Sequence, residues 1–223
     1  MLEPTFKDFD PAGEVEVYWT DLPHWRQEGA TYFVTFRLAD SIPRRILQHW
    51  AELRDNWCQA HGLVRTLEAR IWNERYRAIP EAERRVFERQ QLGHLLVELD
   101  RCHGSSELRN SEAASIVADS LSFFDRRLLR CGDFIVLPTH VHWLVLPYSG
   151  IKLEGILQST KRYSATRINQ ILNRSGRLWQ PGSFDHIVRD RDELSKIREY
   201  IQENGVNAGL SPDDYFYYRA DWL

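Results

Sequence analysis

The sequence predicts an α+β protein in which helices pack on an antiparallel sheet and a helical insertion follows the first strand. Residues 31–38 (TYFVTFRL) form an alternating run of aromatic and β-branched side chains, which is typical of a half-buried strand. Two apolar runs flank Pro138-Thr139 and predict an antiparallel hairpin. Strands and helices do not alternate strictly, so we expect three to five antiparallel strands with helices on one face.

A helical insertion is expected between the first strand and the hairpin. From residue 44 to 61, apolar side chains recur every three or four positions, as in an amphipathic helix. A highly charged helical pattern continues from 63 to 99 and is interrupted at Ile79-Pro80, because proline ends a helix. We interpret residues 1–223 as one domain with a helical insertion at about 44–99.

The second half of the chain completes the predicted fold. Gly205 is expected to stop the last helix, because glycine favours helix ends. The expected elements are a helix from Asn110 or Ser111 to 129, strands at 131–137 and 142–147, a helix at 152–173, an extended stretch at 178–188 and a helix at 192–204.

Composition excludes several classes of protein. The chain has 223 residues, of which 43% are hydrophobic and 27% charged, as in ordinary globular proteins. Its three cysteines lie far apart, which argues against a disulfide framework and indicates a reducing compartment. The sequence shows neither a secretory leader nor an apolar run of membrane-spanning length. We therefore expect a cytoplasmic protein without a membrane partner.

The net charge of −3 does not itself indicate a nucleic-acid-binding protein. However, residues 152–177 carry a local net charge of +5, which suits contact with a phosphate backbone. A solvated helix face explains the same charges. The basic residues of this segment are Lys152, Lys161, Arg162, Arg167, Arg174 and Arg177.

Two histidines stand two residues apart at the start of the second hairpin strand. Because side chains alternate along a strand, His140 and His142 are expected to point to the same face. Two neutral imidazoles aimed at one point make half of a divalent-metal site. A chance pair on an edge strand, or a hydrogen-bonded structural feature, explains the two histidines as well.

The last predicted helix carries Tyr200 and Asn204 one turn apart, beside its apolar stripe. If this helix packs on the face that bears His140 and His142, a phenol, a carboxamide and two imidazoles converge. Ordinary amphipathic packing with an asparagine at the helix end explains the pair equally well.

Four segments occur together in a specific order, and their combination resembles the single-tyrosine HUH transposases, in particular the REP-associated tyrosine transposases of the IS200-like group. The resemblance implies a ferredoxin-like, RRM-like core. It covers about residues 32–38 and 100–210. The four segments are FIVLPTHVHWLVLP, LEGILQSTKRYSATRIN, LWQPGSFDHIVRD and ELSKIREYIQENGVNAGL.

The resemblance implies a role for each residue singled out above. His140, His142 and Asn204 match the family's metal ligands, and Tyr200 matches its nucleophile. Imidazole and oxygen ligands suit Mn²⁺ and also accept Mg²⁺. Gly205 replaces the proline of the family motif, which we expect to loosen the segment after Asn204.

The implied activity is cleavage and rejoining of single-stranded DNA that carries REP-like hairpins, through a covalent 5′-phosphotyrosine. The segment 152–177 and Arg189 are the candidates for backbone contacts, and Trp179, Phe184 and His186 are candidates for base stacking. The protein is expected to act as a monomer or a homodimer.

Three alternatives remain open at the level of sequence. Tyr163 is a competing nucleophile, because it also lies on a helix that follows the histidine pair. A domesticated protein that binds DNA hairpins without cleaving them explains the fold and the basic segment. A metal hydrolase of small molecules explains His140 and His142 but leaves Tyr200 and Asn204 without a role.

Overall fold

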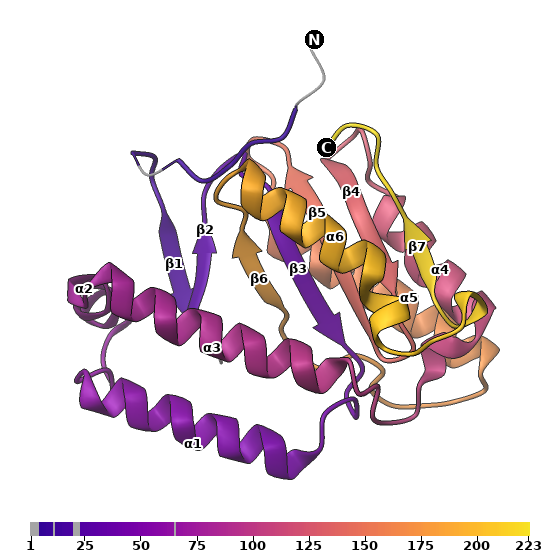
Figure 1. The fold of residues 1–223 in the computed structure, drawn as a ribbon, viewed down its shortest axis with the longest axis horizontal. Coiled ribbons are helices and arrows are strands. Elements are labelled where there is room, and N and C mark those ends of the chain that lie inside the picture. Colours follow the sequence, from indigo (N-terminus) through magenta and orange to yellow (C-terminus); the bar gives the residue numbers. More distant parts are fainter. Residues whose placement is uncertain (1–4, 11, 20–22, 65) are drawn as a thin grey trace.

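A five-stranded antiparallel sheet is the centre of the computed structural model, which describes residues 5–10, 12–19, 23–64 and 66–223. The strand order is β6-β3-β5-β4-β7 (Figure 1). Helices pack on this sheet, so the α+β class predicted from sequence is confirmed. The strands are β3 (Tyr32–Arg37), β4 (Leu129–Val136), β5 (His140–Pro147), β6 (Phe184–Ile187) and β7 (Phe216–Tyr218).

Helices cover both faces of the sheet. Helices α4 (Ser111–Ser122) and α5 (Leu153–Ile171) lie on one face, and α6 (Arg191–Asn207) crosses the other (Figure 1). The expectation that all helices lie on one face is therefore wrong. The cause is visible in β3, where Val34 packs into the core beneath α4 and α5 and Phe33 packs beneath α6. A strand that is apolar on both sides needs a cover on each side.

The register of the sheet fixes the histidines in its middle. β5 pairs with β4 on one side and with β3 on the other, and Thr35 lies opposite His142 while Arg37 lies opposite His140. The predicted hairpin is thus present, and His140 is the first residue of its second strand. Leu137 donates its backbone N–H to the carbonyl oxygen of His140 at 2.9 Å, which closes the turn.

The helical segment between β3 and α4 lies beside the sheet, next to β6 (Figure 1). It has its own small apolar cluster, which includes Trp72 and Tyr76. Leu99 at the end of α3 is fully buried and brings the chain back to the sheet. The three helices are α1 (Arg44–Ala60), α2 (Ala69–Ala78) and α3 (Glu81–Leu99).

Sequence reasoning missed three strands. A two-stranded ribbon, β1 (Glu16–Trp19) and β2 (Pro23–Arg26), precedes the sheet, and β7 forms one of its edges. The carboxylate of Asp185 in β6 holds the ribbon, because it accepts hydrogen bonds from His24 at 2.6 Å and from Arg26. These strands are only three or four residues long, too short for an alternating pattern to be recognised.

Two predicted helix ends are wrong. The helix that begins at Ser111 ends at Ser122 instead of continuing to residue 129. Helix α6 runs through Gly205 to Asn207, so this glycine does not stop the helix. The ring of Tyr215 lies against Gly205, and a Cβ atom at this position would come within 2.4 Å of it. The segment after Asn204 is thus helical up to Asn207 and packs against Tyr215. Within the described ranges, no helix is both long and apolar enough to span a membrane.

Candidate functional site

His140 and His142 lie side by side on the sheet face that α6 covers. Both side chains are fully buried, and their ring centroids are 4.7 Å apart. Burial lowers the pKa of His140 to about 3. Burial, together with the neighbouring His140, lowers the pKa of His142 well below its ordinary value. Both imidazoles are therefore neutral at pH 7, which leaves each ring a nitrogen lone pair.

Each imidazole is held through its Nδ1 atom. The hydroxyl of Thr35, on the neighbouring strand β3, lies 2.7 Å from Nδ1 of His142. The hydroxyl of Thr139 lies 3.1 Å from Nδ1 of His140. Phe33 stacks on the His142 ring with a centroid distance of 5.5 Å. These contacts leave the Nε2 atoms for the interior of the site, and Nε2 of His140 has no hydrogen-bond partner among the described residues.

Tyr200 on α6 faces the histidine pair. Its hydroxyl lies 3.2 Å from Nε2 of His142, and its ring meets Phe33 edge to face. Burial raises the pKa of Tyr200 above its ordinary value, and the carboxylate of Asp100 raises it further. The phenol is consequently protonated at neutral pH in the structure as it stands.

Asn204 lies one helical turn after Tyr200 and is only 1% exposed. Its Nδ2 atom donates to Oδ1 of Asp100 at 3.3 Å, whereas its Oδ1 atom has no partner among the described residues. The structure thus places the four residues predicted from sequence around one point: two imidazoles, a phenol and a carboxamide.

Asp100 is the member of this cluster that sequence reasoning missed. It follows α3 directly and contacts both Asn204 and Tyr200. Burial raises the pKa of Asp100, although hydrogen bonds from Asn204 and Tyr200 oppose this shift. Its only signal in the sequence is its place at the end of a charged helical segment, which does not distinguish it from a solvated residue.

The donor set at this point fits a divalent cation. His140 Nε2 and Asn204 Oδ1 are buried acceptor atoms without a hydrogen bond among the described residues, an arrangement that is costly unless a ligand satisfies it. Two neutral imidazoles and an amide oxygen are ligands that Mn²⁺ accepts. The described residues contain no group of three histidine, cysteine, aspartate or glutamate side chains that could hold a metal, and the unpartnered amide oxygen of Asn204 is the candidate third ligand.

The basic residues of 152–177 are not brought to the histidines, because α5 lies on the opposite face of the sheet (Figure 1). Lys161 is turned inward and donates to the carbonyl oxygens of Gln180 at 2.6 Å and Gly182 at 2.5 Å. Burial, together with Arg37, lowers the pKa of Lys161 to about 8. The remaining positions with exposed side chains are Lys152, Arg162, Arg167 and Arg177.

Two further predicted cations form ion pairs. Arg174 lies 2.8 Å from Glu107 and Arg189 lies 3.5 Å from Glu88. Tyr163, the competing nucleophile, is 54% exposed and belongs to α5, which packs on the sheet face opposite the histidines. The geometry favours Tyr200 over Tyr163.

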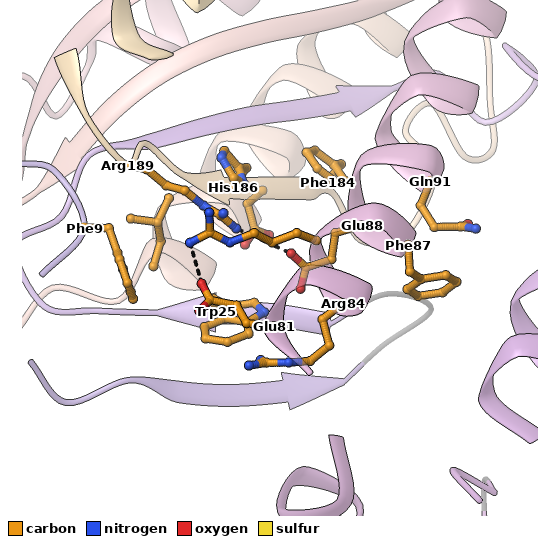
Figure 2. Close-up of a pocket in the computed structure, with 13 residues that line it drawn as sticks. Phe9, Trp25, Glu81, Arg84, Phe87, Glu88, Gln91, Phe184, His186 and Arg189 are labelled. Carbon is orange, nitrogen blue, oxygen red and sulfur yellow. Dashed lines mark hydrogen bonds and ion pairs between the residues drawn. The ribbon is translucent and has the colours of Figure 1, made fainter. Parts of the chain in front are cut away.

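The predicted stacking residues fall into two groups. Trp179 belongs to the core, where its indole donates to Ser164 at 3.0 Å and packs edge-on against Phe36. Phe184 and His186 line a separate cavity of about 270 Å³ between α3 and β6, together with Arg189 (Figure 2). His186 is tied to Glu193 at 3.0 Å.

The fold and site together define a class: an α+β protein with a histidine pair on a central strand and a tyrosine on the helix that covers it. Residues 116–204 match the family model described as "Transposase IS200 like", which confirms the resemblance drawn from the motifs. This stretch contains both histidines, Tyr200 and Asn204.

The chain was also compared with solved structures and with curated proteins. A solved structure described as "Structure of the REP associates tyrosine transposase bound to a REP hairpin" aligns with 92% of this chain and 94% of its own, at 14% identity and a TM-score of 0.47. Among curated proteins, none matches the chain.

Proposed function

We propose that this protein is a metal-dependent tyrosine transposase that cleaves and rejoins single-stranded DNA through a covalent 5′-phosphotyrosine on Tyr200. The observation that carries the proposal is the 3.2 Å approach of the Tyr200 hydroxyl to His142, within a segment that matches the IS200-like transposases. A phenol held beside a pair of neutral, buried histidines is an arrangement suited to nucleophilic attack on phosphorus.

His140, His142 and Asn204 would hold Mn²⁺ or Mg²⁺. When bound, this ion supplies Lewis-acid polarisation of the scissile phosphate and favours the phenolate. The chain's own contribution is to keep both imidazoles neutral by burial and to fix their orientation through Thr35 and Thr139.

The reaction conserves bond energy and needs no nucleotide cofactor. The oxygen of Tyr200 forms a bond to phosphorus, the bond between phosphorus and the 3′ oxygen breaks, and the phenol loses its proton while the leaving oxygen gains one. The free 3′ hydroxyl can later attack the phosphotyrosine and restore a phosphodiester. Helix α6 positions the nucleophile for both steps, because it packs on the sheet through Leu194 and Ile201.

The proposed substrate is single-stranded DNA with REP-like hairpins. The proposed location of the protein is the cytoplasm. The exposed cations of the segment 152–177, Lys152, Arg162, Arg167 and Arg177, are proposed to contact the hairpin backbone away from the reacting phosphate. Lys161, Arg174 and Arg189 already contact other groups of the chain and contribute less to this surface. The hydroxyl of Tyr200 lies 3.2 Å from Nε2 of His142 in the same chain, which supports a site formed by one chain, whether the protein acts as a monomer or as a homodimer.

Cleavage of an end-labelled oligonucleotide tests the proposal. The oligonucleotide carries an imperfect hairpin with a short unpaired flank and is incubated with the full chain and Mn²⁺. We expect a nicked product that depends on Mn²⁺ and disappears in the His140→Ala variant. Tight binding without any nicked product would overturn the proposal and favour a protein that only binds DNA hairpins.

A further inference from the structure

The carboxylate of Asp100 contacts the proposed metal ligand Asn204, and none of the sequence motifs assigns Asp100 a role. Oδ1 of Asp100 accepts a hydrogen bond from Nδ2 of Asn204 at 3.3 Å. The two residues are 104 positions apart in the chain, so the contact is tertiary and does not follow from the helix that carries Asn204.

A carboxamide presents an oxygen on one side and an amino group on the other, and only the oxygen is a metal ligand. In the structure Oδ1 of Asp100 is the acceptor, so Asp100 pairs with the amino group of Asn204 and leaves the amide oxygen of Asn204 free of this contact. Oδ1 of Asn204 is correspondingly left buried and without a partner among the described residues, as is Nε2 of His140. The Asp100 contact therefore selects the orientation of the amide that a cation requires.

The backbone of Asp100 is itself fixed. The backbone N–H of Asp100 donates to the carbonyl oxygen of Leu96 at 3.0 Å, at the end of α3. The backbone N–H of Cys102 donates to the carbonyl oxygen of Leu99 at 2.9 Å. Leu99 is fully buried beside it. The end of the helical insertion thus presents the carboxylate to the site at a set position.

We propose that Asp100 is a positioning residue that orients the Asn204 amide toward the metal, so that the helical segment 44–99 is coupled to the site through the end of α3. This inference rests on the proposed function. Partners of this kind, one contact behind a metal ligand, typically change metal affinity 10- to 100-fold.

Mn²⁺ titration of the full chain without DNA, followed by electron paramagnetic resonance, tests the role independently of cleavage. We expect Asp100→Ala to weaken Mn²⁺ binding about 10- to 100-fold. Asp100→Asn should retain most of the affinity, because its amide oxygen can still accept from Asn204. Asp100→Ser provides a second truncation, and circular dichroism checks that each variant is folded. Asp119→Ala, at an exposed position on α4, is the matched control.

A double-mutant cycle separates an orienting role from direct ligation. If Asp100 acts through Asn204, Asp100→Ala adds no further loss in an Asn204→Ala background. A full additional loss there would overturn the inference, because it would make Asp100 act on the ion without Asn204. Unchanged affinity in folded Asp100→Ala and Asp100→Ser, with binding abolished in His140→Ala, overturns the inference but leaves the proposed function standing. Affinity unaffected by His140→Ala would overturn both.

Discussion

The hydroxyl of Tyr200 lies 3.2 Å from Nε2 of His142, although the two residues are 58 positions apart in the chain. The contact exists because α6 covers the sheet face to which the alternation of β5 directs His142. Everything proposed about catalysis depends on this juxtaposition of a phenol with a buried histidine pair.

The hydroxyl of Thr35 holds His142 at a distance of 2.7 Å, so its removal should loosen the ring. We expect Thr35→Val, which preserves volume, to lower Mn²⁺ affinity and single-turnover cleavage about 10- to 100-fold. Thr166→Val is the control, because Thr166 is exposed on α5 and its hydroxyl donates to the carbonyl oxygen of Arg162 within the same helix. Equal activity of the two variants would contradict the assigned role of Thr35.

Gly205 is required for packing against Tyr215. A Cβ atom at Gly205 would lie within 2.4 Å of the Tyr215 ring, so Gly205→Ala should cost about 1–3 kcal/mol of unfolding free energy through overpacking. Gly93→Ala, on α3 with open space around it, should instead stabilise the protein by up to about 1 kcal/mol. Urea unfolding measures both changes. The loss of unfolding free energy caused by Gly205→Ala should be smaller when Tyr215 is also replaced by alanine. An equal loss in that background would refute the contact between Gly205 and the Tyr215 ring.

Asp185 ties the β1–β2 ribbon to the sheet through His24 and Arg26. Asp185→Ala removes one of the two carboxylates that pair with Arg26 and leaves the Glu154 contact in place, so it should cost about 1–3 kcal/mol through the lost hydrogen bonds. Asp119→Ala, at an exposed position, should be nearly neutral in the same urea titration.

The effect of Asp185 depends on pH in a defined direction. Burial alone would raise its pKa, but hydrogen bonds from His24 and Arg26 lower it below the ordinary value. The unfolded chain, with a pKa near 3.9, therefore takes up the proton before the folded protein does. The stabilisation is complete above about pH 4 and is lost as the pH falls through the folded pKa. The difference between wild type and Asp185→Ala should shrink as the pH falls below about 4, whereas a difference that grows there would contradict this assignment.

The exposed cations of α5 are expected to serve binding and not chemistry, because they lie on the sheet face opposite the site. Replacing Arg162 and Arg167 with alanine should weaken hairpin binding and reduce the salt slope by about 2, because each arginine is expected to neutralise one phosphate. Cleavage of the DNA-saturated complex should remain at the wild-type rate. A reduced rate at saturation with unchanged affinity would show that these residues act at the reacting phosphate.

The sequence predicts which site residues lie together on one strand or one helix. It does not predict the contacts between different strands and helices. His140 and His142 follow from strand alternation, and Tyr200 and Asn204 follow from helix spacing. Asp100 shows no local pattern, because its role depends on where the insertion returns to the sheet. The second helical face was missed for a related reason: a strand buried on both sides does not show from sequence which helix covers which side.

Mapping of the covalent protein–DNA adduct tests the central claim most directly. A hairpin oligonucleotide is incubated with Mn²⁺ and the full chain, and the adduct is isolated on a denaturing gel and located by peptide mass spectrometry. We predict that the 5′-phosphate is attached to Tyr200, that Tyr200→Phe abolishes the adduct and that Tyr163→Phe retains it. An adduct that persists in Tyr200→Phe and disappears in Tyr163→Phe would contradict the account.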